Sequence, residues 1–315
     1  MVSVIIPVKN GARTIAKCLD SVLALDYSDY EVIVVDDGST DETTAILTAY
    51  NKRVQVITNK QSYGPSESRN LAAKLAKGEY LAFTDSDCLV DKDWLKELVG
   101  GMKADDIVSV GGAQMTPDDD SDFGKKVSRF MQKIGFATDY IHKGKYKTVS
   151  VSHNPSCNAI YRKEVLLKED GFRRGLWPGE DVELDYRLRK RGYRLVFNPK
   201  AVIFHYRIPT PKSYINMMYR YGYVQAFMVR AYGIFRTIQL FPFILLGLIC
   251  IMVLSIFFKP MIAYYLIAIF SLSLPFVLSH LYSRTLSLLV ITLFYWNIGF
   301  LCGFFSPKNP ITNNT

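Results

Sequence analysis

Short apolar runs and amphipathic segments alternate along the first part of the chain. Four runs have the length and composition of buried strands: Val2–Val8, Tyr30–Asp36, Val54–Thr58 and Tyr80–Thr84. Three segments between them have the features of helices: Thr14–Leu25, Ser39–Tyr50 and Ser66–Leu75. Ser39 and Glu42 have the spacing of a capping box, which predicts where the second helix begins. Strands that alternate with helices in this way predict an α/β fold with a mostly parallel sheet.

Two later segments have the pattern of amphipathic helices. One apolar face runs through Phe123–Ile134, with basic residues mostly on the opposite face. The second segment, Pro211–Arg236, mixes tyrosines with basic residues. Both compositions suit helices that lie in the headgroup layer of a membrane, and the alternative for each is an ordinary half-buried helix.

Three apolar segments follow near the C-terminus. They cover residues 240–258, 261–278 and 286–305, and each approaches the ~20 residues that a helix needs to cross a bilayer. No Asp or Glu occurs between Leu240 and Phe305. The alternative is a buried helical core, but three such segments in succession favour membrane embedding. Pro275 also fits a re-entrant hairpin in place of a second crossing.

This pattern divides the chain into four parts. We expect a catalytic domain at 1–208, an interfacial segment at 209–239, about three membrane helices within 240–305, and a tail at 306–315. No basic, cleavable leader precedes the first strand, so a secretory signal is not expected. Arg220, Arg230 and Arg236 lie before the first membrane segment, and the positive-inside tendency predicts a catalytic domain on the cytoplasmic face.

Charge and cysteine content narrow the function classes. The formal net charge is +9, which anionic lipids and phosphate-bearing substrates explain better than nucleic acid does, given a membrane anchor. The five cysteines show no CxxC spacing, and two of them lie in the apolar region. This spacing argues against a disulfide framework and against a zinc site.

Pairs of carboxylates follow two of the predicted strands. Asp85 and Asp87 come directly after the strand Tyr80–Thr84, and Asp36 and Asp37 end the strand that begins at Tyr30. Two neighbouring ionised carboxylates need a cation or an exposed setting, and hard divalent cations prefer oxygen ligands. Ligands in parallel sheets bind at the carboxyl ends of strands, so these side chains are candidates for a ligand site.

A third acidic motif, Gly179-Glu180-Asp181, opens a predicted helix. A carboxylate at a helix N-terminus is stabilised by the helix dipole, so capping is one interpretation. The other is a general base that accepts a proton from a substrate.

These motifs together resemble family 2 glycosyltransferases of the GT-A fold, a Rossmann-like mixed sheet that binds nucleotide-diphospho-sugars. The resemblance covers roughly residues 1–208. The motifs occur in the family's order: Val4-Ile5-Ile6-Pro7-Val8-Lys9-Asn10, Val35-Asp36-Asp37-Gly38-Ser39-Thr40-Asp41, Arg69-Asn70, Thr84-Asp85-Ser86-Asp87 and Gly179-Glu180-Asp181.

The resemblance implies roles for individual residues. Nucleotide-sugar binding is expected of Pro7, Asn10, Asp37, Arg69, Asp85, Trp177, Glu180 and Arg220. Mg2+ or Mn2+ is expected at Asp87, with Asp85 and His205. Asp181 would be the general base of an inverting displacement. For His205 the alternative is a structural side chain whose hydrogen bonds are satisfied within the protein. For Trp177 the alternative is packing in the core.

The implied function is transfer of a sugar from a nucleotide donor to a membrane acceptor. The donor is expected to be a UDP-sugar. A polyprenyl or dolichyl phosphate, or a lipid-linked glycan, is the expected acceptor, with membrane lipids as further partners. Two alternatives stay open: a polysaccharide synthase, and a catalytically silent membrane scaffold. Processive members carry Gln-x-x-Arg-Trp at about this distance beyond the base, whereas this chain keeps only Arg220 of that motif. This departure weakens the synthase interpretation.

Overall fold

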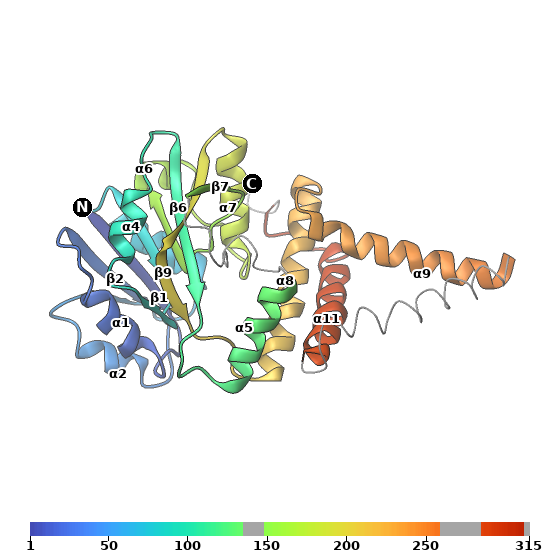
Figure 1. The fold of residues 1–315 in the computed structure, drawn as a ribbon, viewed down its shortest axis with the longest axis horizontal. Helices are drawn as coiled ribbons and strands as arrows, with labels where there is room; N and C mark the ends of the chain where they lie inside the picture. Colours follow the sequence, from blue (N-terminus) through green and yellow to red (C-terminus); the bar gives the residue numbers. More distant parts are fainter. Residues whose placement is uncertain (135–147, 259–284, 312–315) are drawn as a thin grey trace. The chain divides into compact units, whose positions relative to one another are not determined.

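The computed structural model describes residues 1–134, 148–258 and 285–311, which form two compact units, Met1–Arg207 and Ile208–Thr315 (Figure 1). The first unit contains a nine-stranded sheet in the order β3-β2-β1-β4-β8-β6-β9-β5, with β7 paired to β9. Its strands are β1 (Val2–Val8), β2 (Tyr30–Asp36), β3 (Gln55–Thr58), β4 (Tyr80–Thr84), β5 (Cys88–Val90), β6 (Ile107–Met115), β7 (Val149–Val151), β8 (Asn158–Arg162) and β9 (Arg194–His205). Its helices are α1 (Ile15–Leu23), α2 (Thr43–Thr48), α3 (Pro65–Leu75), α4 (Trp94–Gly100), α5 (Asp122–Ile134), α6 (Lys163–Lys168) and α7 (Glu180–Lys190).

The N-terminal half of the sheet is parallel. β1 pairs in parallel with both β2 and β4, and β2 pairs in parallel with β3. All seven residues of β1 are buried, because helices cover both faces of the sheet. Burial on both faces explains why this strand is a continuous apolar run in the sequence rather than an alternating one.

The other half of the sheet is mixed. β8 runs antiparallel to both β4 and β6, whereas β6 and β9 are parallel. β5 then pairs antiparallel with the end of β9, which sets Cys88 opposite His205. The simple alternation of strands and helices predicted only the parallel half, and the mixed sheet of the GT-A fold is confirmed.

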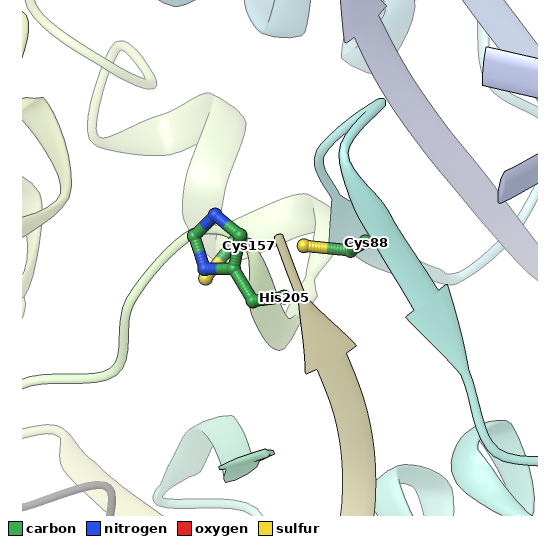
Figure 2. A group of neighbouring side chains, drawn as sticks. All are labelled: Cys88, Cys157 and His205. Atoms are coloured by element: carbon green, nitrogen blue, oxygen red, sulfur yellow. The ribbon is translucent and has the colours of Figure 1, made fainter. Parts of the chain in front are cut away.

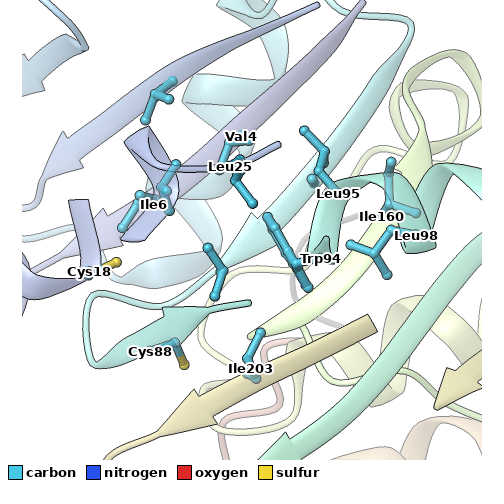
Figure 3. Packing of buried hydrophobic residues seen from close by; sticks show 14 of the residues in the cluster. Val4, Ile6, Cys18, Leu25, Cys88, Trp94, Leu95, Leu98, Ile160 and Ile203 are labelled. Atoms are coloured by element: carbon cyan, nitrogen blue, oxygen red, sulfur yellow. The ribbon is translucent and has the colours of Figure 1, made fainter. Parts of the chain in front are cut away.

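Two apolar layers lie on opposite faces of the sheet. On one face, α1, α2 and α4 pack against the side chains of Val4 and Ile6, and Trp94 fills the middle of this layer (Figure 3). On the other face, α3, α6 and α7 pack against Ile5 and Ile33. The even and odd residues of β1 therefore serve different layers, as the twofold repeat of a strand requires. The helices packed on both faces of the sheet hold the strand ends, and the loops that follow them, in fixed positions.

The helix after β2 begins later than the sequence predicted. α2 starts at Thr43, with Glu42 at the N-cap position and no capping bond from its side chain. The predicted capping box is wrong, because the Ser39 hydroxyl instead accepts a hydrogen bond from the backbone N–H of Asn10, at 2.9 Å. Ser39 thus belongs to the connection between two strand ends rather than to the helix.

The second unit is helical where it is described. It contains α8 (Pro211–Tyr232), a short 3-10 helix (Thr237–Leu240), α9 (Phe241–Phe258) and α11 (Leu286–Phe304). α8 and α11 approach closely at glycines: a Cβ on Gly222 would collide with the carbonyl oxygen of Trp296, and a Cβ on Gly299 with that of Tyr219. Small residues at such crossings let two helix backbones pack at short distance.

Two described segments are long and apolar enough to cross a membrane, Thr237–Ser255 and Leu286–Phe304. Their mean hydropathies are 2.5 and 1.8, yet only 12% and 39% of these windows are buried within the described chain. Long apolar helices that leave most of their side chains on the surface are typical of contact with lipid. The predicted segment 261–278 lies outside the described residues.

Candidate active site

The carboxyl ends of the parallel strands place several polar side chains at one edge of the sheet. Asn10 follows β1 and adopts a left-handed backbone conformation with φ of 52°. Its side-chain oxygen accepts a hydrogen bond from the backbone N–H of Thr40, at 2.8 Å. Asn10 therefore ties the end of β1 to the loop after β2. Pro7 lies in β1 itself, where its ring is buried.

Asp37 accepts four hydrogen bonds from one loop. Its donors are the side chains of Asn59 and Ser62 and the backbone N–H groups of Tyr63 and Gly64, at 2.6–2.9 Å. Burial acts to raise the pKa of the Asp37 carboxyl, but these hydrogen bonds outweigh burial and lower it. The ionised carboxylate thus fixes the loop 59–64, which leads into α3. Asp37 therefore fixes the connection between β3 and α3.

Arg69 on α3 joins two acidic motifs that are distant in sequence. Its guanidinium contacts the Asp85 carboxylate at 2.7 Å and the Glu180 carboxylate at 2.5 Å. Burial opposes the charged form, but Asp85 and Glu180 outweigh it and raise the pKa of Arg69. Burial also raises the pKa of Glu180, against the effect of Arg69. The turn after β4 is thereby held beside the N-terminus of α7.

Asp181 is the second residue of α7 and stays partly accessible, with 16% of its side chain exposed. One carboxylate oxygen accepts a hydrogen bond from the backbone N–H of Ser156, at 3.1 Å. His153 Nε2 lies 3.9 Å from the other oxygen. The carboxylate is therefore oriented from two sides, while unused lone pairs can accept a substrate proton.

A buried network lies behind Asp181. Asp185, one helical turn further along α7, is fully buried and accepts hydrogen bonds from His153 Nδ1 at 2.8 Å and from the Tyr161 hydroxyl at 3.0 Å. The backbone N–H of Asn154 also donates to Asp185. Burial raises the pKa of the Asp185 carboxyl, against the effect of His153. Asp185 thus fixes the ring that faces Asp181.

The sequence analysis missed His153 and Asp185. The i, i+4 spacing of Asp181 and Asp185 places both carboxylates on one face of α7, and this spacing was a usable signal. For His153 the signal was weaker, because only the polar composition of the segment 152–158 sets it apart.

Asp87, directly before β5, faces His205 at the end of β9. His205 Nε2 lies 3.4 Å from an Asp87 carboxylate oxygen. Burial alone would lower the pKa of His205, but the Asp87 carboxylate outweighs it and raises that pKa to about 10. Asp87 keeps 43% of its side chain exposed and Asp85 keeps 30%. Accessible carboxylates and an imidazole are donor types that suit Mn2+ or Mg2+.

Two further residues were predicted to bind the donor. Trp177, just ahead of α7, has 50% of its surface exposed, so core packing does not explain it. Arg220 lies on α8, in the second unit. The remaining residues predicted for the site come together at the strand ends and at the start of α7.

Comparison with known proteins identifies the family. Residues 3–168 match the family model Glycosyl transferase family 2. The chain is 29% identical over 255 residues to Glycosyltransferase AglE of Haloferax volcanii, covering 78% of this chain and 80% of the relative. It is 26% identical over 259 residues to the Dolichyl N-acetyl-alpha-D-glucosaminyl phosphate 3-beta-D-2,3-diacetamido-2,3-dideoxy-beta-D-glucuronosyltransferase of Methanococcus voltae, covering 77% of this chain and 78% of the relative.

Solved structures show the same fold at low sequence identity. The mannosyltransferase PcManGT from Pyrobaculum calidifontis, in complex with GDP-Man and Mn2+, has a TM-score of 0.69 at 18% identity over 98% of this chain and 88% of that one. S. aureus TarS 1-349 in complex with UDP-GlcNAc has a TM-score of 0.53 at 21% identity, over 72% of this chain and 66% of that one. With a family model matched over more than half of its length, the chain belongs to glycosyl transferase family 2 and is a glycosyltransferase with the GT-A fold.

Proposed function

We propose that this glycosyltransferase is metal-dependent and inverting, and that it moves a sugar from a uridine-linked donor to a lipid-linked acceptor. The acceptor is a polyprenyl or dolichyl phosphate or diphosphate, or a glycan carried on one. Two features support a lipid acceptor. The name of the Methanococcus voltae relative specifies a dolichyl-linked substrate, and two apolar helices of the second unit suit a bilayer.

The observation that carries the catalytic part of this proposal is the bridge formed by Arg69. One buried guanidinium contacts Asp85 after β4 and Glu180 at the start of α7. Asp181 follows Glu180 directly, and its partly exposed carboxylate is near enough to act on the pKa of Arg69, which also contacts Asp85 in the turn after β4. A donor held at the turn would then lie within reach of a base on α7.

In the proposed reaction Asp181 acts as the general base. It accepts the proton of the acceptor hydroxyl, and the hydroxyl oxygen forms a bond to the anomeric carbon of the donor sugar. The bond from that carbon to the diphosphate oxygen breaks, and the electron pair leaves with the nucleoside diphosphate. Because attack and departure occur on opposite faces, the anomeric configuration inverts, and no protein nucleophile is needed.

Other side chains would position the donor. Asp87, with Asp85 and His205, would hold Mg2+ or Mn2+, which offsets the negative charge that develops on the leaving diphosphate. The backbone at Pro7 and the loop fixed by Asp37 would face the nucleotide. These roles agree with the accessible carboxylates at the turn and with the hydrogen bonds that hold the loop.

Trp177 would stack on the face of a sugar ring, in the manner of an aromatic platform. Its half-exposed side chain, two residues before Gly179 and the start of α7, supports this role.

The anchoring part of the proposal concerns the C-terminal segments. Residues 209–239 would lie at the membrane interface, and apolar helices within 240–305 would cross the bilayer with the catalytic domain in the cytoplasm. The arginines before α9 support this orientation through the positive-inside tendency.

The test uses the full chain purified in detergent. Radiolabelled UDP-sugars and GDP-mannose are each incubated with Mn2+ and polyprenyl or dolichyl phosphate, and lipid-soluble label is measured. The proposal predicts lipid-soluble label with a UDP-sugar, its absence in the Asp181→Asn variant, and the opposite anomeric configuration in the product. Label that appears only on free sugar or on soluble acceptors would reject the lipid acceptor.

A further inference from the structure

Two cysteines and one histidine from distant parts of the first unit form a compact cluster. The sulfur atoms of Cys88 and Cys157 and a ring nitrogen of His205 all lie within 4.8 Å of one another (Figure 2). Both cysteines are buried, whereas 18% of the histidine side chain is exposed. The absence of any CxxC spacing had argued against a zinc site, but long-range strand pairing assembles these ligands without a local motif.

The sheet itself fixes the three side chains. Cys88 opens β5 and lies opposite His205 in the antiparallel pair of β5 and β9. Cys157 directly precedes β8, which lies between β4 and β6. Side chains directly opposite on neighbouring strands point to the same face, so Cys88 and His205 converge by register. Figure 2 shows the two thiols and the imidazole directed toward one another.

A carboxylate lies beside two members of this cluster. An Asp87 carboxylate oxygen is 3.4 Å from His205 Nε2 and 3.9 Å from Cys88 Sγ. In a tetrahedral zinc site with Zn–S bonds of about 2.3 Å, two sulfur ligands lie about 3.8 Å apart. The two sulfur atoms and the ring nitrogen, all within 4.8 Å of one another, are within about an ångström of that spacing. On the other side of the ring, His205 Nδ1 lies 3.4 Å from the Gln114 side-chain oxygen and 3.3 Å from the Arg207 guanidinium, so Nε2 is the ring nitrogen on the Asp87 side.

We propose that Cys88, Cys157 and His205, completed by Asp87, form a binding site for a thiophilic divalent ion of the Zn2+ class. Two thiolates and an imidazole select such ions over Mg2+ and Mn2+, which prefer oxygen ligands. If the proposed function holds, Asp87 and His205 also serve the metal that accompanies the donor. A neutral imidazole has one coordinating nitrogen and cannot bind both ions at once, so a bound zinc-class ion takes His205 from the Mn2+–nucleotide complex and inhibits transfer.

The first experiment tests the site without reference to catalysis. Co2+ is titrated into the reduced, metal-stripped full chain, and sulfur-to-cobalt charge transfer is followed by absorbance. We expect a charge-transfer band that saturates at one ion per chain and disappears when Zn2+ is added. The band should be lost in Cys88→Ser and Cys157→Ser and kept in Cys18→Ser, which alters another buried cysteine of the same domain. A wild-type spectrum with oxygen and nitrogen ligation only, or a band that survives in both cysteine variants, would overturn the site.

A second measurement tests mutual exclusion and checks that the variants are folded. The binding of UDP and of GDP in the presence of Mn2+ is titrated calorimetrically, with and without one equivalent of Zn2+. Zn2+ should weaken nucleotide binding at least tenfold in the wild type and leave it unchanged in Cys88→Ser and Cys157→Ser. Thiolate-bound Co2+ together with undiminished nucleotide binding would overturn the exclusion. A chain that binds Co2+ through its thiols but binds neither nucleotide would refute the proposed function instead, so the two failures are distinguishable.

Discussion

Arg69 and Glu180 form an ion pair of 2.5 Å although 111 residues separate them in the sequence. Only 2% of the Arg69 side chain and 3% of the Glu180 side chain are exposed. This pair fastens α3 to the first residue of α7, and it sets the position of Asp181, the next residue. The position of the candidate base therefore depends on this buried contact between two distant segments.

Removing one partner of this pair is expected to destabilise the first unit. Arg69→Ala leaves the Glu180 carboxylate buried without its cation, which typically costs about 3–5 kcal/mol of the free energy of unfolding. A lowered thermal midpoint in detergent measures the loss. As a control, Arg194→Ala removes the exposed ion pair with Asp106 and should leave the midpoint nearly unchanged. Equal midpoints for Arg69→Ala and the control would show that the buried pair is not a structural link.

The loop held by Asp37 is expected to lose stability in acid. Burial acts to raise the pKa of Asp37, but its four hydrogen bonds lower it overall. The Asp37 carboxyl of the unfolded chain therefore binds its proton at a higher pH than that of the folded chain. The hydrogen-bonded carboxylate then contributes fully to the free energy of unfolding above about pH 4, and this contribution is lost as pH falls through the folded pKa. Urea unfolding at several pH values should show wild type and Asp37→Asn converging at acid pH. A difference that stays constant with pH would contradict this assignment.

His153 and Asp185 are expected to act on catalysis through Asp181. His153→Ala removes the ring beside Asp181, and Asp185→Asn replaces the carboxylate that orients the ring. Both changes should lower kcat less than Asp181→Asn does and leave the KM for the donor unchanged. Tyr161→Phe, which removes one hydroxyl contact to Asp185, is a milder comparison. A raised donor KM with an unaltered kcat would show that this network serves binding rather than the base.

Packing in the second unit is expected to depend on glycine where α8 and α11 cross. A side chain at Gly299 would collide with the backbone of Tyr219, whereas a Cβ at Gly247 in α9 meets no described atom within 4 Å. Gly299→Leu should therefore increase proteolytic cleavage and amide exchange in α8. Gly247→Leu makes the same change in side-chain size and should leave both unchanged. If the two variants behave alike, the close crossing is not what holds these helices.

The sequence predicted the parallel half of the sheet well, and the structure explains why. β1, β2 and β4 have the bounds read from their apolar runs, because helices bury both faces of these strands. Hydropathy alone therefore marks where such strands begin and end. The helix start at Ser39 could not be read in the same way, because the hydroxyl bonds to Asn10, a residue in another loop.

Contacts between distant segments limited the prediction of the site. Asp87, Asp181 and His205 stood out because their motifs resemble a known family. The i, i+4 spacing could have marked Asp185, but its contact with His153 depends on the packing of a loop against α7, which that spacing does not reveal. The thiol cluster depends on the register between β5 and β9, since a shift by one residue would turn Cys88 to the other face.

The single-turnover rate of sugar transfer by Asp181→Asn, measured beside the affinity for donor with Mn2+, tests the central claim most directly. Loss of a general base typically lowers the rate about 10²- to 10⁴-fold. The account predicts a loss of this size with donor affinity close to that of the wild type, because the amide keeps the shape of the carboxylate but cannot accept the proton. A variant that transfers sugar at the wild-type rate would contradict it.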